Sequence, residues 1–141
     1  MQSNYTEVTL IPGDGIGPEI TRATKEVLAA LNAPIKWIEC NAGEKAFLEE
    51  GSPLPEATMA SIRNTKYALK GPLSTPSGGG YRSATVQMRE AFDLYANVRP
   101  AKTLLNGRYS GVDIILVREN IQGLYAAQEM WIEQGGDRHA I

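Results

Sequence analysis

Apolar positions along the chain alternate between short β-branched runs and longer stretches with helical spacing. The run from Val8 to Ile11 is closed by Pro12-Gly13-Asp14-Gly15, which predicts a strand that ends in a turn. Pro18 suits the first turn of a helix, and apolar residues then recur every three or four positions until Pro34. These are Ile20, Ala23, Val27, Leu28 and Leu31. The chain therefore opens with a strand followed at once by a helix.

The same alternation continues along the chain and indicates the fold class. Further strands are expected at residues 35–40, 67–69, 94–98 and 112–117, and further helices around residues 46–50, after Pro55 and after Ser83. Strands that alternate with helices form βαβ units, whose strands are parallel. The pattern predicts an α/β protein with an open, mostly parallel sheet flanked by helices. Residues 103–111 are expected to form a surface linker.

A segment rich in glycine and proline, residues 71–80, follows the third predicted strand. It holds too many helix and strand breakers to form a regular element. Loops at the strand ends of an open α/β sheet are where ligands usually bind. We therefore expect this loop to face a ligand.

Composition narrows the class of ligand. The 141 residues are 43% apolar and carry a formal net charge of −2, which is typical of one compact domain and lacks the field that attracts nucleic acid or an acidic membrane. No apolar run approaches the roughly 18 residues of a membrane span, and the polar start of the chain does not resemble a signal peptide. The single cysteine, Cys40, is interpreted as a structural thiol. We expect a cytoplasmic protein that handles small molecules, with no nucleic-acid or membrane partner.

Glycines at the first turn allow two interpretations. Gly13-Asp14-Gly15-Ile16-Gly17-Pro18 joins a predicted strand to a predicted helix, where backbone amides can meet a phosphate. Counted from Gly13, the third glycine of the dinucleotide fingerprint is replaced by Pro18. The segment is thus either a tight structural turn or a turn that faces a ligand.

Arginines interleaved with hydroxyl residues give a stronger signal for binding. Arg99 and Arg118 are each expected at the end of a strand, and Arg89 lies on the helix that follows the glycine-rich loop. Thr75 and Ser83 lie in or beside that loop. Guanidinium groups bind carboxylates and phosphates through paired hydrogen bonds, so the set suits a ligand with several such groups. Each arginine taken alone could instead be a solvated surface residue.

Other catalytic residues are poorly represented. The lone histidine, His139, lies at the end of the sequence, and no pair of aspartates one helical turn apart could hold a divalent metal. Tyr125 follows Arg118 by seven residues and is either a packing aromatic or, near cations that lower its pKa, a proton donor. A metal site complete within these residues is not expected.

Four segments resemble the decarboxylating isocitrate and isopropylmalate dehydrogenases, which act on 2-hydroxy acids with a malate-like core. They are Ile11-Pro-Gly-Asp-Gly-Ile-Gly-Pro-Glu19, Leu69-Lys-Gly-Pro-Leu-Ser-Thr-Pro76 with Arg82-Ser83, Asp93-Leu-Tyr-Ala-Asn-Val-Arg-Pro100, and Val117-Arg-Glu-Asn120 followed by Tyr125. They match in order and spacing over essentially the whole chain. The second segment is more similar to the isocitrate branch.

The resemblance implies roles for individual residues. Ser83, Arg89, Arg99 and Arg118 would bind the carboxylates of isocitrate, and Tyr125 would be the proton donor at the enol stage. Thr75 and Thr85 would lie on the nicotinamide side of the substrate. The cofactors implied are NAD and Mg²⁺ or Mn²⁺. The implied reaction is oxidative decarboxylation, in which a metal stabilises the enolate.

Departures from the family pattern leave the function open. Thr85 stands where the family usually has Asn, and Ile121-Gln122-Gly123-Leu124 stands where it has a hydroxyl residue and Glu. Family members are more than twice as long, and their second half supplies the catalytic lysine, the metal-binding aspartates and the adenosine-binding segments. We therefore expect residues 1–99 to correspond to the first part of the large domain and residues 100–141 to the start of the small, dimer-forming domain.

Three interpretations follow from this resemblance. The chain is a shortened dehydrogenase that does not turn over alone, a noncatalytic anion-binding or regulatory partner of a full-length subunit, or a gene fragment without a selected function. Its expected partners are a di- or tricarboxylate and a second chain, either another copy or a full-length relative. Uncovered strand edges favour such association.

Overall fold

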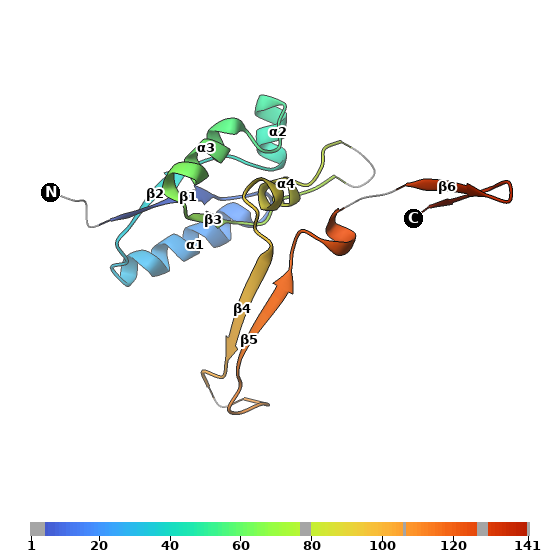
Figure 1. The fold of residues 1–141 in the computed structure, drawn as a ribbon. Helices are drawn as coiled ribbons and strands as arrows, with labels where there is room; N and C mark the ends of the chain where they lie inside the picture. The colour runs from blue at the N-terminus through green and yellow to red at the C-terminus, as the bar shows by residue number, and fades with distance from the viewer. Residues whose placement is uncertain (1–4, 77–79, 106, 127–129, 141) are drawn as a thin grey trace. The chain divides into compact units, whose positions relative to one another are not determined.

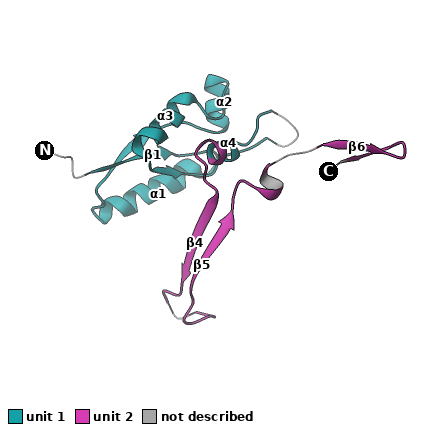
Figure 2. Ribbon diagram, in the orientation of Figure 1, with its two compact units in different colours: residues 1–88 teal, residues 89–141 magenta. Residues whose placement is uncertain are grey.

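The computed structural model describes residues 5–76, 80–105, 107–126 and 130–140. Its chain divides into two compact units, residues 1–88 and residues 89–141 (Figures 1 and 2). The predicted division between a large and a small domain at residues 99 and 100 stays a prediction. No helix among the described residues is long and apolar enough to cross a membrane.

Unit 1 is built on a three-stranded parallel sheet. Its strands are β1 (Thr6–Ile11), β2 (Ile35–Glu39) and β3 (Ala68–Lys70), in the order β2-β1-β3. The β-branched run that predicted the first strand is the buried centre of this sheet, because β1 has a partner on each side. The predicted α/β class with a mostly parallel sheet is confirmed.

Helices cover both faces of this sheet. Helix α1 (Gly17–Ala30) lies on one side, and α2 (Glu44–Glu50) and α3 (Glu56–Thr65) lie on the other (Figure 1). Successive strand residues point to opposite faces. Thr9 therefore meets α3, where its buried hydroxyl is within hydrogen-bond distance of Ser61 Oγ (2.7 Å) and Thr65 Oγ1 (2.9 Å). Leu10 points to the opposite face, among residues of α1.

The predicted helix and strand types of unit 1 are confirmed with small changes of boundary. Helix α2 ends where Gly51 takes a left-handed conformation (φ 73°), and α3 begins after Pro55, as the sequence predicts. Most of the apolar repeat on α1 is exposed, including Ile20, Val27 and Leu31. The buried residues of α1 are Gly17 and Thr21, because only the first half of the helix packs closely against the turn after β1.

Unit 2 contains two antiparallel strand pairs. Strand β4 (Ala96–Lys102) pairs with β5 (Asp113–Glu119), and β6 (Trp131–Gln134) pairs with β7 (Asp137–Ala140). The short 3-10 helix η1 (Gly123–Ala126) lies between them in sequence, and helix α4 (Ala84–Ala91) spans the boundary between the units. The hydrophobic pattern did not indicate β6 and β7. Residues 103–112 connect β4 to β5, which agrees with the expected linker.

The predicted bounds of β4 were wrong at both ends. A strand was expected at residues 94–98, ending before Arg99-Pro100, but β4 starts at Ala96 and runs through both residues to Lys102. Proline is tolerated here because each strand of a two-stranded ribbon is an edge, so a missing N–H breaks no central ladder. Strand β5 likewise runs two residues further than expected, to Glu119.

Candidate functional site

Arg99 and Arg118 share one face of the β4–β5 ribbon. In the antiparallel register Asn97 is opposite Arg118 and Arg99 is opposite Leu116, which makes the two arginines diagonal neighbours. Side chains at such positions are about 7–8 Å apart and within reach of each other's long side chains. The Arg99 Nε–H donates to Asn97 Oδ1 (3.1 Å), which places that guanidinium along the ribbon toward the Arg118 row. Both arginines lie within strands; the expectation that they end them was wrong.

Arg89 lies in the last turn of α4, at the corner that leads into β4. The Leu94 N–H donates to the carbonyl oxygen of Arg89 (2.8 Å), and the Leu94 carbonyl accepts a hydrogen bond from Asn120 Nδ2 (3.1 Å). Asn120 follows β5 directly and is 7% exposed. It therefore ties the end of the strand that carries Arg118 to the corner beside Arg89.

Asn120 also carries an unusual buried acceptor. Within the described part of the chain its Oδ1 atom is buried without a hydrogen-bond partner. Sequence reasoning used Asn120 only as a motif residue and missed this tie, because nothing local in the sequence brings residue 120 next to residue 94. Buried side-chain amides are usually paired at both atoms, whereas Asn120 is paired only through Nδ2, which donates to the Leu94 carbonyl.

The hydroxyl residues of the predicted site belong to unit 1. Thr75 is exposed in the loop after β3, Ser83 is half-buried directly before α4, and Thr85 is half-buried in the first turn of that helix. The Ser83 carbonyl accepts from the Gln87 amide (3.0 Å), so Ser83 stands at the helix N-terminus as expected. The convergence of these residues with the arginines of unit 2 on one ligand stays a prediction.

Tyr125 has its backbone in η1. Its side chain lies outside the described part of the structure, so its role as a proton donor stays a prediction. The turn before η1 is held by Glu119, whose Oε1 accepts from the amides of Ile121 (2.7 Å) and Gln122 (2.6 Å). These backbone hydrogen bonds lower the pKa of Glu119 below its ordinary value.

The Gly13–Pro18 turn is a structural junction between two loops. The Asp14 amide donates to the Pro72 carbonyl (2.8 Å), so the turn after β1 lies against the loop after β3. A Cβ at Gly13 would overlap the Pro72 carbonyl, and one at Gly71 would overlap the Pro12 carbonyl. Glycine at these two positions permits the close approach of the two backbones. The geometry thus supports the interpretation of a tight structural turn.

Asp14 is the centre of this junction, and sequence reasoning missed it. The residue is 8% exposed, and its carboxylate accepts backbone hydrogen bonds from Glu44 (3.0 Å), Lys45 (3.4 Å) and Ser74 (2.8 Å). The first two amides are at the N-terminus of α2, where a carboxylate is favourable for the helix dipole. The third belongs to the loop that carries Thr75.

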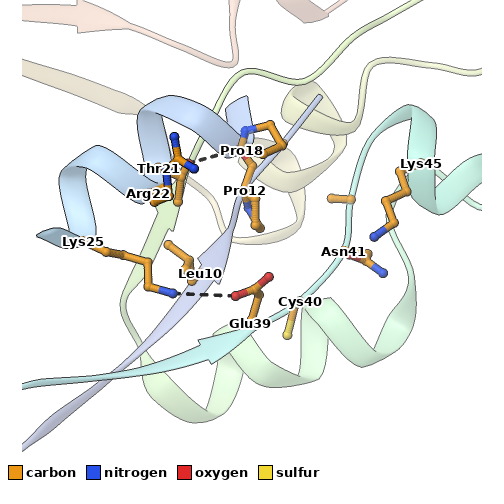
Figure 3. Close-up of a pocket in the computed structure, with 12 residues that line it drawn as sticks. Leu10, Pro12, Pro18, Thr21, Arg22, Lys25, Glu39, Cys40, Asn41 and Lys45 are labelled. Atoms are coloured by element: carbon orange, nitrogen blue, oxygen red, sulfur yellow. Dashed lines mark hydrogen bonds and ion pairs between the residues drawn. The ribbon is translucent and has the colours of Figure 1, made fainter. Parts of the chain in front are cut away.

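A cavity of about 290 Å³ lies at the carboxyl ends of β1 and β2 (Figure 3). Arg22 and Lys25 reach it from α1 and Lys45 from α2, opposite the single carboxylate of Glu39, which is 3.9 Å from Lys25 Nζ. Cys40 lines the cavity and is a free, half-buried thiol. The described residues contain no group of three metal-ligating side chains.

Solved structures place this architecture in a known class of enzyme. A crystal structure of isocitrate dehydrogenase from Methylococcus capsulatus superposes with a TM-score of 0.81 at 45% sequence identity. The match covers 96% of this chain and 41% of that one. The fold is therefore of the isocitrate/isopropylmalate dehydrogenase type.

Sequence comparison assigns the family. The family model described as isocitrate/isopropylmalate dehydrogenase matches residues 7–141. Subunit 2 of the mitochondrial NAD-dependent isocitrate dehydrogenase of Saccharomyces cerevisiae is 43% identical over 127 residues, which cover 89% of this chain and 34% of that protein. A regulatory subunit of the mitochondrial NAD-dependent enzyme of Dictyostelium discoideum is 41% identical over 129 residues, covering 90% and 35%. The chain belongs to the isocitrate/isopropylmalate dehydrogenase family and spans about a third of the length of these relatives.

Proposed function

We propose that this chain binds isocitrate and forms the acid-binding part of an NAD-linked oxidative decarboxylase. The observation that carries the proposal is the shared face of Arg99 and Arg118 on the β4–β5 ribbon, within the segments that match the family. Two guanidinium groups one diagonal apart suit a ligand whose carboxylates are a few ångströms apart. Arg89, Ser83 and Thr75 complete the proposed contacts.

The arginines have two tasks in this proposal. They neutralise the carboxylates of the acid and hold the acid in one orientation. A substrate held in this way reacts at a lower entropic cost in the steps that follow. Tyr125 would donate the proton that ends the reaction at the enol stage. Thr75 and Thr85 are the residues of this chain that would meet the nicotinamide, which, when bound, accepts a hydride from C2.

The proposed metal, Mg²⁺ or Mn²⁺, does not fit the described residues alone, because they offer no three ligating side chains together. Its ligands and the adenosine site would come from further family segments. In this proposal the described residues bind the substrate, and catalysis depends on those further segments.

A regulatory role is the second candidate. The Dictyostelium relative named as a regulatory subunit is almost as similar to this chain as the yeast subunit. Thr85 and the segment Ile121-Gln122-Gly123-Leu124 depart from the pattern of the family that this sequence resembles. A protein of this kind would bind the acid without converting it.

Isocitrate should stabilise the chain by mass action. At ten times its dissociation constant a ligand adds about 1.4 kcal/mol to the free energy of unfolding, and differential scanning fluorimetry would record a rise of several degrees in Tm. Arg118→Ala should abolish most of the rise, and added salt should reduce it. Arg108→Ala is the matched control, because Arg108 lies in the turn at the far end of the same ribbon and stacks on Tyr109. An unchanged Tm at millimolar isocitrate would contradict the proposal.

A further inference from the structure

Ser74, the residue before Thr75 in the loop after β3, is held by hydrogen bonds to both its N–H and its carbonyl group. The Ser74 N–H donates to Asp14 Oδ2 (2.8 Å), and the Ser74 carbonyl oxygen accepts from the Tyr81 hydroxyl (3.0 Å). These two bonds fix the peptide groups that precede and follow the Cα atom of Ser74. Ser74 lies outside both β3 and α4, so these two bonds belong to neither element and act on the loop itself.

Asp14 is a rigid anchor for this loop. The same carboxylate accepts from the amides of Glu44 and Lys45 at the start of α2, and it is almost fully buried. A Cβ at Gly43 would overlap Asp14 Oδ2, so glycine opens the space that the carboxylate fills. Three backbone donors from two segments leave this carboxylate little freedom to move.

Tyr81 is anchored to the same helix. Its ring packs against Phe47 of α2, with centroids 4.7 Å apart and planes tilted by 41°. Burial raises the pKa of the Tyr81 phenol, and the carboxylates of Asp14 and Glu44 raise it further. The hydroxyl therefore remains a proton donor at neutral pH. Both residues that hold Ser74 are thus fixed relative to α2.

The effect on Thr75 follows from the geometry of the peptide bond. The Ser74 carbonyl and the Thr75 amide belong to one planar group, so the Tyr81 hydrogen bond also sets the direction of the Thr75 N–H. We infer that Asp14 and Tyr81 are positioning residues that fix Thr75 for its contact with the bound acid. We call the two hydrogen bonds that Ser74 makes with Asp14 and Tyr81 the Ser74 clamp. The inference rests on the proposed function, because it assigns the purpose of this clamp to the proposed ligand site.

Tyr81→Phe tests the clamp with the least disturbance, because it keeps the ring against Phe47 and removes only the hydroxyl. We expect an almost unchanged Tm and a dissociation constant for isocitrate that is weaker by about three- to tenfold, the ratio that corresponds to one ordinary hydrogen bond. The Ser74 amide keeps its hydrogen bond to Asp14, but its hydrogen exchange by NMR should become faster, because the carbonyl group on the other side of the Ser74 Cα atom is no longer held. Tyr67→Phe is the matched control, since Tyr67 is exposed and lies before β3 in the same unit.

The outcomes separate this inference from the function on which it rests. Unchanged exchange at Ser74 in Tyr81→Phe overturns the clamp. Faster exchange with unchanged isocitrate affinity overturns the positioning role. If the unmodified chain binds no isocitrate, the proposed function fails and the positioning role fails with it. Exchange at Ser74 would then still show whether the two hydrogen bonds hold the loop. Exchange at the Lys66 amide, bonded to Ile62 in α3, should not change in either variant.

Discussion

At the scale of single residues, the junction of the loops in unit 1 depends on the carboxylate of Asp14, which is bonded to backbone amides in place of water. Asp14 is buried, yet its two oxygens accept from three N–H groups. A buried charge is costly unless it is hydrogen-bonded in this way. Gly43 makes the arrangement possible, because its φ of +86° and its lack of a Cβ leave room for the carboxylate.

Gly43→Ala should therefore destabilise the chain more than an ordinary glycine substitution does. The new Cβ would displace the Asp14 carboxylate from its amides, and we expect a loss of about 3 kcal/mol in the free energy of unfolding. Gly51→Ala is the control, because Gly51 also has a positive φ (73°) but nothing within 4 Å of the Cβ position. It should cost only about 1 kcal/mol. Urea denaturation of both variants measures the difference, and equal losses would contradict the role given to Asp14.

At the scale of elements, the β4–β5 ribbon has two different faces. One carries Asn97, Arg99 and Arg118 together with the exposed Ile114 and Leu116. The other carries the exposed side chains of Val98, Pro100, Ile115 and Val117. The apolar face is bounded by charged residues, with an ion pair between Lys102 and Asp113 at one end (3.4 Å). The four exposed apolar side chains of the second face form a contiguous row, and such exposed apolar surface marks a site of interaction with another chain. We propose that a second chain covers the apolar face.

Association through this face should respond to a change of one side chain. We expect dimers or larger species at tens of micromolar, and Ile115→Thr should weaken their dissociation constant about tenfold, because it removes apolar area while keeping a β-branched residue. Ile114→Thr is the matched control on the opposite face of the same strand. Light scattering over a dilution series measures both. A monomer at high micromolar concentration with a cooperative melt would contradict the prediction.

At the scale of the whole molecule, the chain has the fold of a dehydrogenase family but about a third of its relatives' length. The described residues include the arginines proposed to bind the acid, and no group of three metal-ligating side chains lies among them. Substrate recognition and the remaining catalytic groups would thus belong to different segments of the family fold.

We therefore expect no turnover from the chain alone. Incubation with isocitrate, NAD and magnesium should give no NADH above a buffer blank, measured by absorbance, because the metal that stabilises the enolate has no complete site in the described residues. A full-length isocitrate dehydrogenase in the same mixture is the positive control. Turnover that survives repurification would show that these residues suffice for catalysis.

The sequence by itself determined the elements of unit 1 and the composition of the candidate site. Periodicity and breakers predicted α1, α2 and α3 because helix capping and amphipathic spacing are local properties. The arginines and Thr75 could be proposed as site residues for a similar reason, since each belongs to a short motif of consecutive residues. Strand bounds in unit 2 were less predictable, because the partner strand decides whether residues such as Arg99 and Pro100 continue a ladder.

Only the tertiary structure decided which of these residues act together. The amides that hold Asp14 are 30, 31 and 60 positions further along the chain, a separation at which no periodicity carries information. The shared face of Arg99 and Arg118 depends on the register of two strands, and a shift of one residue would send one arginine to the other face. Register and loop contacts are set by packing across the fold, so they follow from the structure rather than from local sequence.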